Sequence, residues 1–250
     1  MPALPVAADP VVQPGLTDRL SRYFRNRRDK GLRDLILAER GRVPGVFTIL
    51  DLGGRVDYWQ RLGFDFLETH DITVLCVNYT AAELHANTIT HPRIAVSVGD
   101  ACNMVGVTDN QYHMVHSNSV IEHVGQFSNV RAFAGEVDRL APAYYVQTPY
   151  FWFPIDPHWP KMPFFHWMPN SWRYKLLCRF ELGWGNPCRD IDHAMSDLEG
   201  TRLLDRRQMN DLFPRGAVRF EWFLGLPKSM IAERRSAVGA RGTNAVLSRA

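Results

Sequence analysis

The segment Thr48-Ile49-Leu50-Asp51-Leu52-Gly53-Gly54 gives the strongest indication of how this chain folds. The run 46–52 is short, apolar and rich in β-branched residues, which is typical of a strand buried on both faces. The two glycines that follow lack a Cβ atom, so the backbone can turn sharply there and approach a ligand closely. Ligands of open parallel sheets bind at the carboxyl ends of the strands. The stretch therefore predicts a nucleotide-like small molecule lying over Gly53-Gly54.

Strand-like and helix-like segments alternate after this point. We predict strands at 46–52, 72–78, 94–98, 112–117 and 144–148, helices at 58–66 and 130–140, and the start of a helix at 81–87. A helix at 207–212 and two strands at 217–223 and 228–232 follow, and the closeness of these strands indicates an antiparallel hairpin. Such alternation predicts an α/β fold with a Rossmann-like, doubly wound, mostly parallel seven-stranded sheet and an antiparallel terminal strand.

Composition divides the chain into three parts. Residues 1–45 form a proline-rich arm and a cap helix, 46–235 the main domain, and 236–250 a small, polar tail that we expect to be mobile. An insertion at about 149–197 interrupts the main domain with repeated prolines. The segment 144–174 holds 12 of the 29 aromatic residues, so we interpret the insertion as an aromatic, proline-rich lid.

The overall composition excludes several classes of protein. The net charge of +3 and the lack of a basic patch with interleaved aromatic residues argue against a nucleic-acid partner. No uninterrupted apolar run approaches the ~18–20 residues that span a bilayer, and no secretory leader is visible. The four cysteines show neither C-x-x-C nor a zinc-like spacing, so we expect reduced thiols and a cytoplasmic protein.

Four blocks of sequence accompany the predicted strands in order. They are Ile49-Leu50-Asp51-Leu52-Gly53-Gly54, Val74-Leu75-Cys76-Val77-Asn78, Val98-Gly99-Asp100-Ala101 and Met114-Val115-His116-Ser117-Asn118-Ser119-Val120-Ile121-Glu122-His123-Val124. In order and approximate spacing the blocks resemble the class I methyltransferases that depend on S-adenosylmethionine (SAM). The resemblance covers residues 46–148 and, less closely, the last two strands. It implies a Rossmann-like fold, bound SAM and methyl transfer.

The resemblance also implies how SAM is held. Asp51 would accept a hydrogen bond from the ammonium group, directly or through water, and Gly53-Gly54 would let the cofactor approach the backbone. Asn78 stands where the family usually has a carboxylate for the ribose hydroxyls, which is a departure from the pattern. The remaining expected cofactor contacts are Asp100 with the adenine amino group, the Ala101 backbone N–H with a ring nitrogen, and Ser117 and Asn118 beside the sulfonium and the adenosyl edge.

Two competing classes fit the sequence less well. A dinucleotide dehydrogenase needs G-x-G-x-x-G after the first strand, whereas this chain reads Gly53-Gly54-Arg55-Val56-Asp57-Tyr58. Methyltransferases of nucleic-acid bases usually carry a proline pair with an aromatic residue after the fourth strand, where this chain has Ser117-Asn118-Ser119-Val120.

Methyl transfer to a hydroxyl needs removal of a proton, and histidine is the natural base near neutral pH. His158, with Asp156 close enough in sequence to orient it, and His123 after the fourth strand are the candidate catalytic residues. Some related methyltransferases bind a divalent cation at the Glu122-His123 position, which implies a possible Mg²⁺ site. The two roles of His123 exclude each other. We assign His113 and His116 to the fourth strand as structural residues.

The sequence of the lid and of the closing segment indicates which class of molecule accepts the methyl group. The block 148–159 and the closing block 223–232 resemble those of bacterial methyltransferases linked to polysaccharide and glycan genes, which implies O-methylation of a sugar or oligosaccharide hydroxyl. A phenolic or lipid small molecule is the alternative substrate, and a non-catalytic SAM-fold interaction protein is the alternative from another class. The aromatic segment also allows a homodimer contact.

Overall fold

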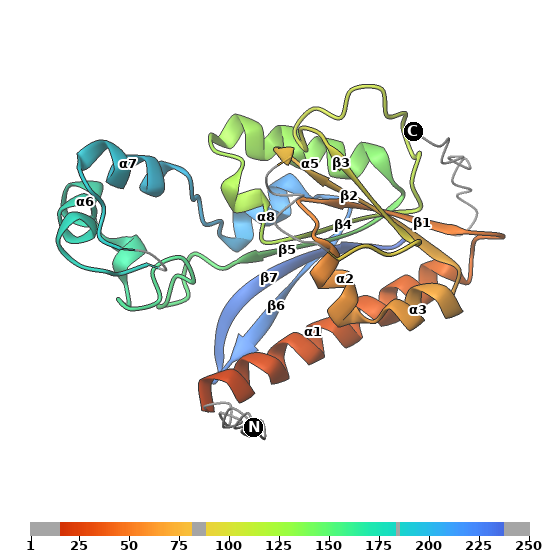
Figure 1. Ribbon diagram of the computed structural model, residues 1–250, viewed down its shortest axis with the longest axis horizontal. Helices are drawn as coiled ribbons and strands as arrows, with labels where there is room; N and C mark the ends of the chain where they lie inside the picture. The colour runs from red at the N-terminus through yellow and green to blue at the C-terminus, as the bar shows by residue number, and fades with distance from the viewer. Residues whose placement is uncertain (1–15, 82–88, 184–185, 238–250) are drawn as a thin grey trace, which may run out of the picture.

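The computed structural model describes residues 16–81, 89–183 and 186–237. Its centre is a seven-stranded sheet with the order β3-β2-β1-β4-β5-β7-β6 (Figure 1). The strands are β1 (Phe47–Leu52), β2 (Ile72–Asn78), β3 (Ile94–Val98), β4 (Met114–Asn118), β5 (Ala143–Pro149), β6 (Ala217–Phe223) and β7 (Leu226–Arg234). β7 is antiparallel to both of its neighbours, and the pairs among β1 to β5 are parallel. The predicted sheet and its antiparallel terminal strand are therefore confirmed.

Helices cover both faces of this sheet. α1 (Leu16–Arg40), α2 (Val56–Leu62) and α3 (Phe64–Thr69) lie on one face, while α5 (Phe127–Leu140) and α8 (Arg206–Leu212) lie on the other (Figure 1). Successive residues of a strand point to opposite faces. Ile49 accordingly packs with Leu35 and Trp59 in one core cluster, and Leu50 packs with Phe133 in the other. Burial on both faces explains why β1 is almost continuously apolar.

The helix expected at 58–66 is two helices. α2 ends at Gly63, whose φ of 114° is the left-handed region that favours glycine, and α3 begins directly after it. The backbone N–H of Gly63 donates to the carbonyl of Trp59, which closes the last turn of α2. The apolar periodicity continues past Gly63 and therefore predicted one helix. The backbone conformation of Gly63 ends α2 at this point.

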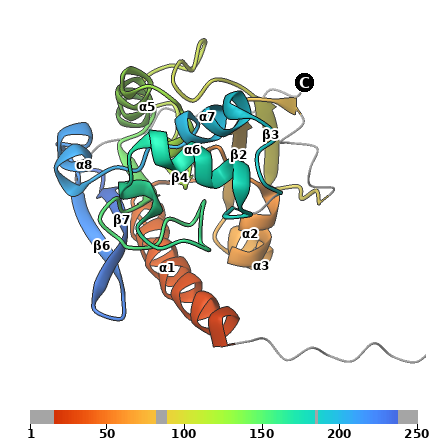
Figure 2. The same cartoon turned by 90° about the vertical axis from the view of Figure 1, so that its left-hand side faces the viewer.

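The lid contains helices that the sequence analysis did not predict. They are the 3₁₀ turn η2 (Phe165–Trp167), α6 (Asn170–Arg179) and α7 (Ile191–Glu199). Figure 1 shows α6 and α7 beyond the end of β5, and Figure 2 shows them in front of β2 and β4. Trp159, Phe165 and Leu177 belong to a separate small core of this segment. The lid thus stands at the carboxyl end of the parallel strands.

Some predictions fall outside the described residues. These are the arm 1–15, most of the helix predicted at 81–87, and nearly all of the tail 236–250. Within the parts that the structure describes, none of the helices combines the length and the apolar character needed to cross a membrane.

Candidate functional site

The glycine turn after β1 has room for no side chain. Gly53 has a φ of +71°, and a Cβ atom there would lie 2.3 Å from Cγ2 of Val120. A Cβ atom on Gly54 would lie 2.1 Å from Oδ2 of Asp51. The backbone N–H of Gly53 donates to the carbonyl of Val77 over 2.7 Å, which ties the turn to β2. Both glycines are therefore required by this geometry.

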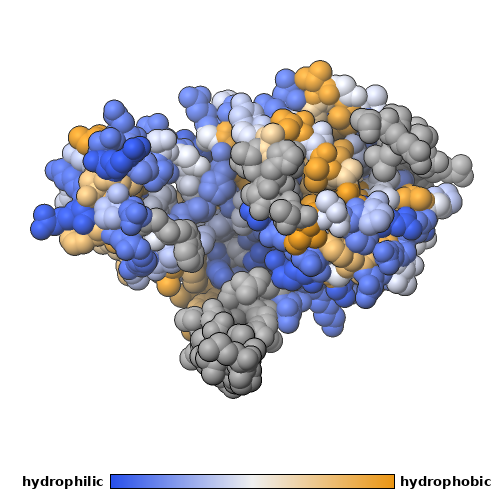
Figure 3. Space-filling model, viewed as in Figure 1, coloured by the Kyte–Doolittle hydropathy of each residue, from blue (hydrophilic) through white to orange (hydrophobic). Residues whose placement is uncertain are grey.

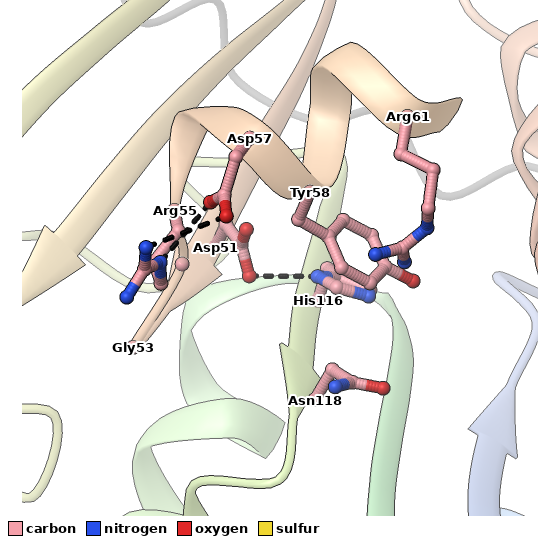
Figure 4. Close-up of a pocket in the computed structure, with 9 residues that line it drawn as sticks. Asp51, Gly53, Arg55, Asp57, Tyr58, Arg61, His116 and Asn118 are labelled. Carbon is pink, nitrogen blue, oxygen red and sulfur yellow. Dashed lines mark hydrogen bonds and ion pairs between the residues drawn. The ribbon is translucent and has the colours of Figure 1, made fainter. Parts of the chain in front are cut away.

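Two cavities meet at this turn. The turn cavity, of about 190 Å³, is lined by Asp51, Gly53, Gly54, Arg55, Asp57, Tyr58, Arg61, His116 and Asn118 (Figure 4). The strand-end cavity, of about 550 Å³, is lined by Gly53, Val77, Asn78, Tyr79, Gly99, Asp100, Ala101, Cys102, Ser119, Val120, His123, Val124 and Asn129. Gly53 belongs to both, so one elongated ligand at the carboxyl ends of the strands would contact both cavities.

Asp51 is buried and its two oxygens already have partners. Its side chain is 1% exposed. Oδ2 accepts a hydrogen bond from Nε1 of Trp59 over 2.7 Å, and Oδ1 lies 2.7 Å from Nδ1 of His116. Burial together with the charge of Asp51 raises the pKa of the neighbouring Cys76 thiol, which stays protonated. Asp51 thus lines the turn cavity as part of a buried network.

Asn78 and Asp100 line the strand-end cavity and also stabilise the backbone beside it. Nδ2 of Asn78 donates to the carbonyl of Gly54 over 2.5 Å. Oδ1 of Asp100 accepts from the backbone N–H of Cys102 over 2.8 Å, so the carboxylate holds the turn after β3. The structure brings Asp100, Ala101 and Asn78 together in one cavity; their contact with the adenosine end of a ligand stays a prediction.

Ser117 and Asn118 behave differently, although they are neighbours in β4. Ser117 is fully buried, its Oγ donates to the carbonyl of Leu52 over 2.9 Å, and it is absent from the residues that line the two cavities. Asn118 lines the turn cavity, and its Oδ1 accepts from Nη1 of Arg28 over 3.0 Å. The structure therefore brings Asn118, but not Ser117, to the candidate cofactor site.

The candidate catalytic residues form one chain of contacts between the lid and the 3₁₀ turn η1 (Ile121–His123). Nδ1 of His158 lies 2.6 Å from Oδ1 of the buried Asp156, and Nδ1 of His123 lies 3.1 Å from the carbonyl oxygen of Gly200. The two Nε2 atoms are 3.0 Å apart. Because a carboxylate and a carbonyl only accept hydrogen bonds, each Nδ1 carries a proton. The facing Nε2 atoms are then left to share a single proton or a cation.

Glu122 lies beside this histidine pair and is completely buried. Its Oε2 accepts from Oγ1 of Thr148 over 3.0 Å, and within the described residues its Oε1 has no partner. Burial raises the pKa of Glu122 to about 7, and partial burial lowers the pKa of His123. Glu122, His123 and His158 each offer a ligand atom, and these atoms lie within 4.8 Å of one another.

Two further cavities flank the site. The lid cavity, of about 690 Å³, is lined by His158, Trp159 and polar residues of α7 and its approaches, among them Asn186, Arg189 and Asp197. The hairpin cavity, of about 360 Å³, has a mainly apolar wall that includes Phe153, Ile155 and Phe223 and shares Ser119 with the strand-end cavity. Figure 3 shows mostly hydrophilic residues on the recessed surface between the lid and the sheet domain.

The sequence analysis missed several residues of the site. His116 was assigned to structure alone, yet it lines the turn cavity and contacts Asp51. The pairing of β1 with β4 could have indicated this role, because these parallel strands place Asp51 opposite His116. Arg28 of α1 also reaches the site through Asn118, and nothing in its local sequence distinguishes it from the neighbouring arginines.

A second cluster of ligand-type side chains lies in the lid. Cys188, His193 and Asp197 come together although the sequence showed no zinc-like spacing. However, the backbone N–H of Arg189 donates to Nδ1 of His193 over 3.3 Å, which leaves the proton of a neutral imidazole on Nε2, the atom facing Asp197. In this tautomer Nε2 has no lone pair for a metal ion, and it lies 3.8 Å from Oδ2 of Asp197 on the surface of α7.

No protein-family model and no curated protein matches the chain. Among solved structures, the chain is similar to magnesium protoporphyrin IX methyltransferase from Synechocystis PCC 6803 with bound S-adenosylhomocysteine, at 12% identity over 90% of this chain and 89% of that one, with a TM-score of 0.50. It is similar to the CMeT domain of citrinin polyketide synthase at 11% identity and a TM-score of 0.56, over 88% of this chain but 54% of that one. A putative Zn-dependent alcohol dehydrogenase from Rhodobacter sphaeroides gives 14% identity, 82% and 89% coverage, and a TM-score of 0.51.

Identities this low show the fold alone. The sheet of this chain differs from the usual dinucleotide-binding sheet, whose strand order is 3-2-1-4-5-6, because here the antiparallel β7 stands between β5 and β6. The four sequence blocks follow the strand ends of this sheet in the order that the resemblance requires. The chain therefore has the Rossmann-like fold of the class I SAM-dependent methyltransferases.

Proposed function

We propose that this protein transfers a methyl group from SAM to a hydroxyl, most favourably a hydroxyl of a sugar or oligosaccharide. The fold and the two adjoining cavities at Gly53 support the cofactor. The amino-acid end of SAM would occupy the turn cavity, and the adenosine would occupy the strand-end cavity beside Asn78, Asp100 and Ala101.

The observation that carries the hydroxyl acceptor is the contact between the two histidines. A base that takes a proton from a hydroxyl must hold that proton while the methyl group moves. The facing Nε2 atoms of His158 and His123, 3.0 Å apart, are close enough to share the proton that the acceptor hydroxyl gives up. Asp156 fixes the orientation of His158, so we assign His158 as the base and His123 as the group that shares the proton.

The lid cavity favours a saccharide. Trp159 and Phe180 offer aromatic surface for the C–H face of a sugar, and Asn186, Arg189 and Asp197 offer polar groups for its hydroxyls. His158 is part of the same wall, so the proposed base would lie beside this surface. The hairpin cavity favours the alternative, a phenolic or lipid acceptor, because its wall is mainly apolar.

A bound cation is a second candidate for the histidine site. The buried, unpartnered Oε1 of Glu122 and the two unprotonated Nε2 atoms of His123 and His158 form a suitable donor set. Two imidazole nitrogens suit Zn²⁺, Mn²⁺ or Fe²⁺ better than the Mg²⁺ expected from the sequence, because Mg²⁺ prefers oxygen ligands. A cation at this position would supply Lewis-acid activation of the acceptor hydroxyl.

Calorimetry with SAM and with S-adenosylhomocysteine (SAH) tests the cofactor. We expect both to bind. Binding of neither would favour the alternative of a non-catalytic interaction protein.

A screen with methyl-labelled SAM across oligosaccharides, phenols and lipids tests the acceptor. We expect label on an oligosaccharide, and loss of transfer in His158→Ala with retained SAH binding. His70→Ala, at the end of α3, is the control and should keep full activity. Label on a phenol or a lipid alone would replace the saccharide proposal with the alternative.

The same assay with a chelator separates the two roles of the histidine pair. Activity that survives chelation supports the proton-sharing base. Activity that is lost on chelation and restored by Zn²⁺ or Mn²⁺ but not by Mg²⁺ supports the cation.

A further inference from the structure

His116 lines the turn cavity, and its Nε2 is a buried polar atom without a partner among the described residues. The side chain is 1% exposed. Leaving a buried polar atom unpaired costs on the order of 1–3 kcal/mol, so such an atom usually has a partner in the working state. The hydroxyls of Tyr58 and Tyr145, whose rings pack on His116, also have no partner among the described residues. Because His116 lines the turn cavity, a ligand bound there is a further candidate partner, and it is the one we test.

The contact with Asp51 determines what Nε2 can do. Nδ1 of His116 lies 2.7 Å from Oδ1 of Asp51, and the ionised carboxylate can only accept a hydrogen bond. Nδ1 therefore carries the proton, and Nε2 of the neutral ring carries a lone pair. Nε2 is an acceptor, and its partner must be a donor.

Aromatic rings hold His116 in this orientation. Tyr58 lies against the ring with centroids 4.9 Å apart, Trp59 meets it edge-on at 5.3 Å, and Tyr145 stacks at 5.9 Å. Trp59 also donates to the other oxygen of Asp51, so the carboxylate is fixed from both sides. Figure 4 shows the resulting arrangement, in which His116 is turned toward Asp51 and lies beside Tyr58.

We propose that Nε2 of His116 accepts a hydrogen bond from the ammonium group of SAM, and that Asp51 acts through His116 as a positioning residue. The proposal rests on the proposed function, because it requires the amino-acid end of SAM in the turn cavity. The resemblance assigned the ammonium contact to Asp51, directly or through water, but both oxygens of Asp51 have protein partners. The negative charge of Asp51 polarises the imidazole and strengthens Nε2 as an acceptor for a cationic donor.

The test compares four ligands that share the adenosine and differ at the other end. SAH carries both the ammonium and the carboxylate, decarboxylated SAH carries the ammonium alone, deaminated SAH carries the carboxylate alone, and methylthioadenosine carries neither. His116→Asn keeps a donor near Oδ1 of Asp51 and removes Nε2. His113→Asn is the matched control, because His113 is also a buried histidine beside β4 but contacts Thr48 rather than the cavity.

We expect His116→Asn to weaken binding of SAH and of decarboxylated SAH by about 10-fold or more, which is the usual effect of a hydrogen bond to a charged group. Binding of deaminated SAH and methylthioadenosine should be unchanged, and His113→Asn should keep the wild-type order of the four ligands. An equal loss for all four ligands would show a structural role and overturn the proposal. A loss confined to ligands with the carboxylate would overturn it as well, because His116 would then be a donor.

A measurement on the wild-type protein keeps the proposal testable if His116→Asn does not fold. In protein labelled with ¹⁵N-histidine, the Nε2 resonance of His116 should shift on addition of decarboxylated SAH and stay in place with methylthioadenosine. The same shift with both ligands, or with neither, overturns the ammonium contact. If wild-type protein binds none of the four ligands, the proposed function itself fails, whereas binding with an unchanged order in His116→Asn removes this inference alone.

Discussion

Asn78 illustrates how one residue can depart from a family pattern for a structural reason. The resemblance placed it where a carboxylate usually binds the ribose hydroxyls. In the structure its Nδ2 donates to the carbonyl of Gly54, so the amide helps to hold the glycine turn. An aspartate has no such donor, and its charge would face a carbonyl oxygen.

We therefore predict that Asn78→Asp lowers the free energy of unfolding by roughly 1–3 kcal/mol, the effect of an unmade buried hydrogen bond, without strengthening SAH binding. Denaturant unfolding and calorimetry measure the two effects. Asn110→Asp, in an exposed turn, is the control and should change neither. Tighter SAH binding at unchanged stability would instead support the ribose role implied by the resemblance.

His113 provides a pH dependence whose sign follows from burial. The side chain is 3% exposed, Nδ1 accepts from the backbone N–H of Thr48 over 3.0 Å, and burial lowers the pKa of His113. The unfolded chain takes up a proton at the ordinary histidine pKa, above that of the folded protein. The stabilising contribution of neutral His113 is therefore present above pH 6.5 and is lost as the pH falls through the folded pKa.

We expect His113→Gln to remove this dependence. Urea unfolding of both proteins at about pH 7.5 and about pH 5 measures it, since histidine titrates in this interval. The stability advantage of the wild type over the variant should shrink toward the lower pH. An advantage that stays constant or grows would show that the folded protein accepts the proton at His113 without cost.

At the level of elements, one capped helix belongs to the sheet domain and another belongs to the lid. Asp205 begins α8 with a capping box, in which its side chain accepts from the N–H of Gln208 while the Gln208 side chain accepts from the N–H of Asp205. Asp190 caps α7 of the lid by accepting from the N–H of His193 over 2.8 Å. α8 packs on the main core, whereas α7 packs on the small lid core.

We predict that Asp205→Ala and Asp190→Ala each cost about 1 kcal/mol of helix stability. The two variants should differ in how much of the molecule they destabilise. Asp205→Ala should lower the melting temperature of the whole protein, whereas Asp190→Ala should leave it unchanged and speed hydrogen exchange within 159–200 alone. Each variant serves as the control for the other. Faster exchange across the sheet in Asp190→Ala would show that the lid and the sheet domain unfold together.

The sheet was predictable from sequence because its rules are local. β2 and β3 match their predicted bounds, because each is a short apolar run between polar turns. β2 is largely buried, whereas β3 is an exposed strand at the edge of the sheet. Lid helices α6 and α7 were not predictable from the same pattern. Closely spaced prolines and aromatic residues obscure helical periodicity, and the apolar faces of both helices pack on a small core of the lid rather than on the sheet.

The site was predictable in part for the same reason. Residues at the ends of strands or just after them, such as Asp51, Gly53 and Asp100, could be named from the chain order, and the structure places them in the walls of the two cavities. His116 became visible only through the register of β1 with β4, and the meeting of His158 with His123 depends on how the lid packs. The acceptor, the cation and a homodimer stay predictions, because each depends on a molecule outside this chain.

On the scale of the whole molecule, an ion pair beside the turn cavity links α1, near the start of the described chain, to β6, near its end. Nε of Arg28 in α1 lies 2.9 Å from Oε1 of Glu221 in β6, and both side chains are about 15% exposed. Nη1 of the same guanidinium donates to Asn118 at the turn cavity. Burial opposes the charge of Arg28, but the pairing with Glu221 outweighs it and raises the Arg28 pKa.

We expect Arg28→Met and Glu221→Gln each to lower the free energy of unfolding by about 2 kcal/mol, somewhat less than for a fully buried pair because solvent reaches both side chains. The double variant should lose less than the sum, since neither charge is then left unpaired. The exposed pair Arg55 and Asp57 is the control and should show a coupling close to zero. Arg28→Met should also weaken SAH binding more than Glu221→Gln does, because only Arg28 holds Asn118. Equal effects of the two variants on SAH binding would mean that α1 stabilises the fold without shaping the cofactor site.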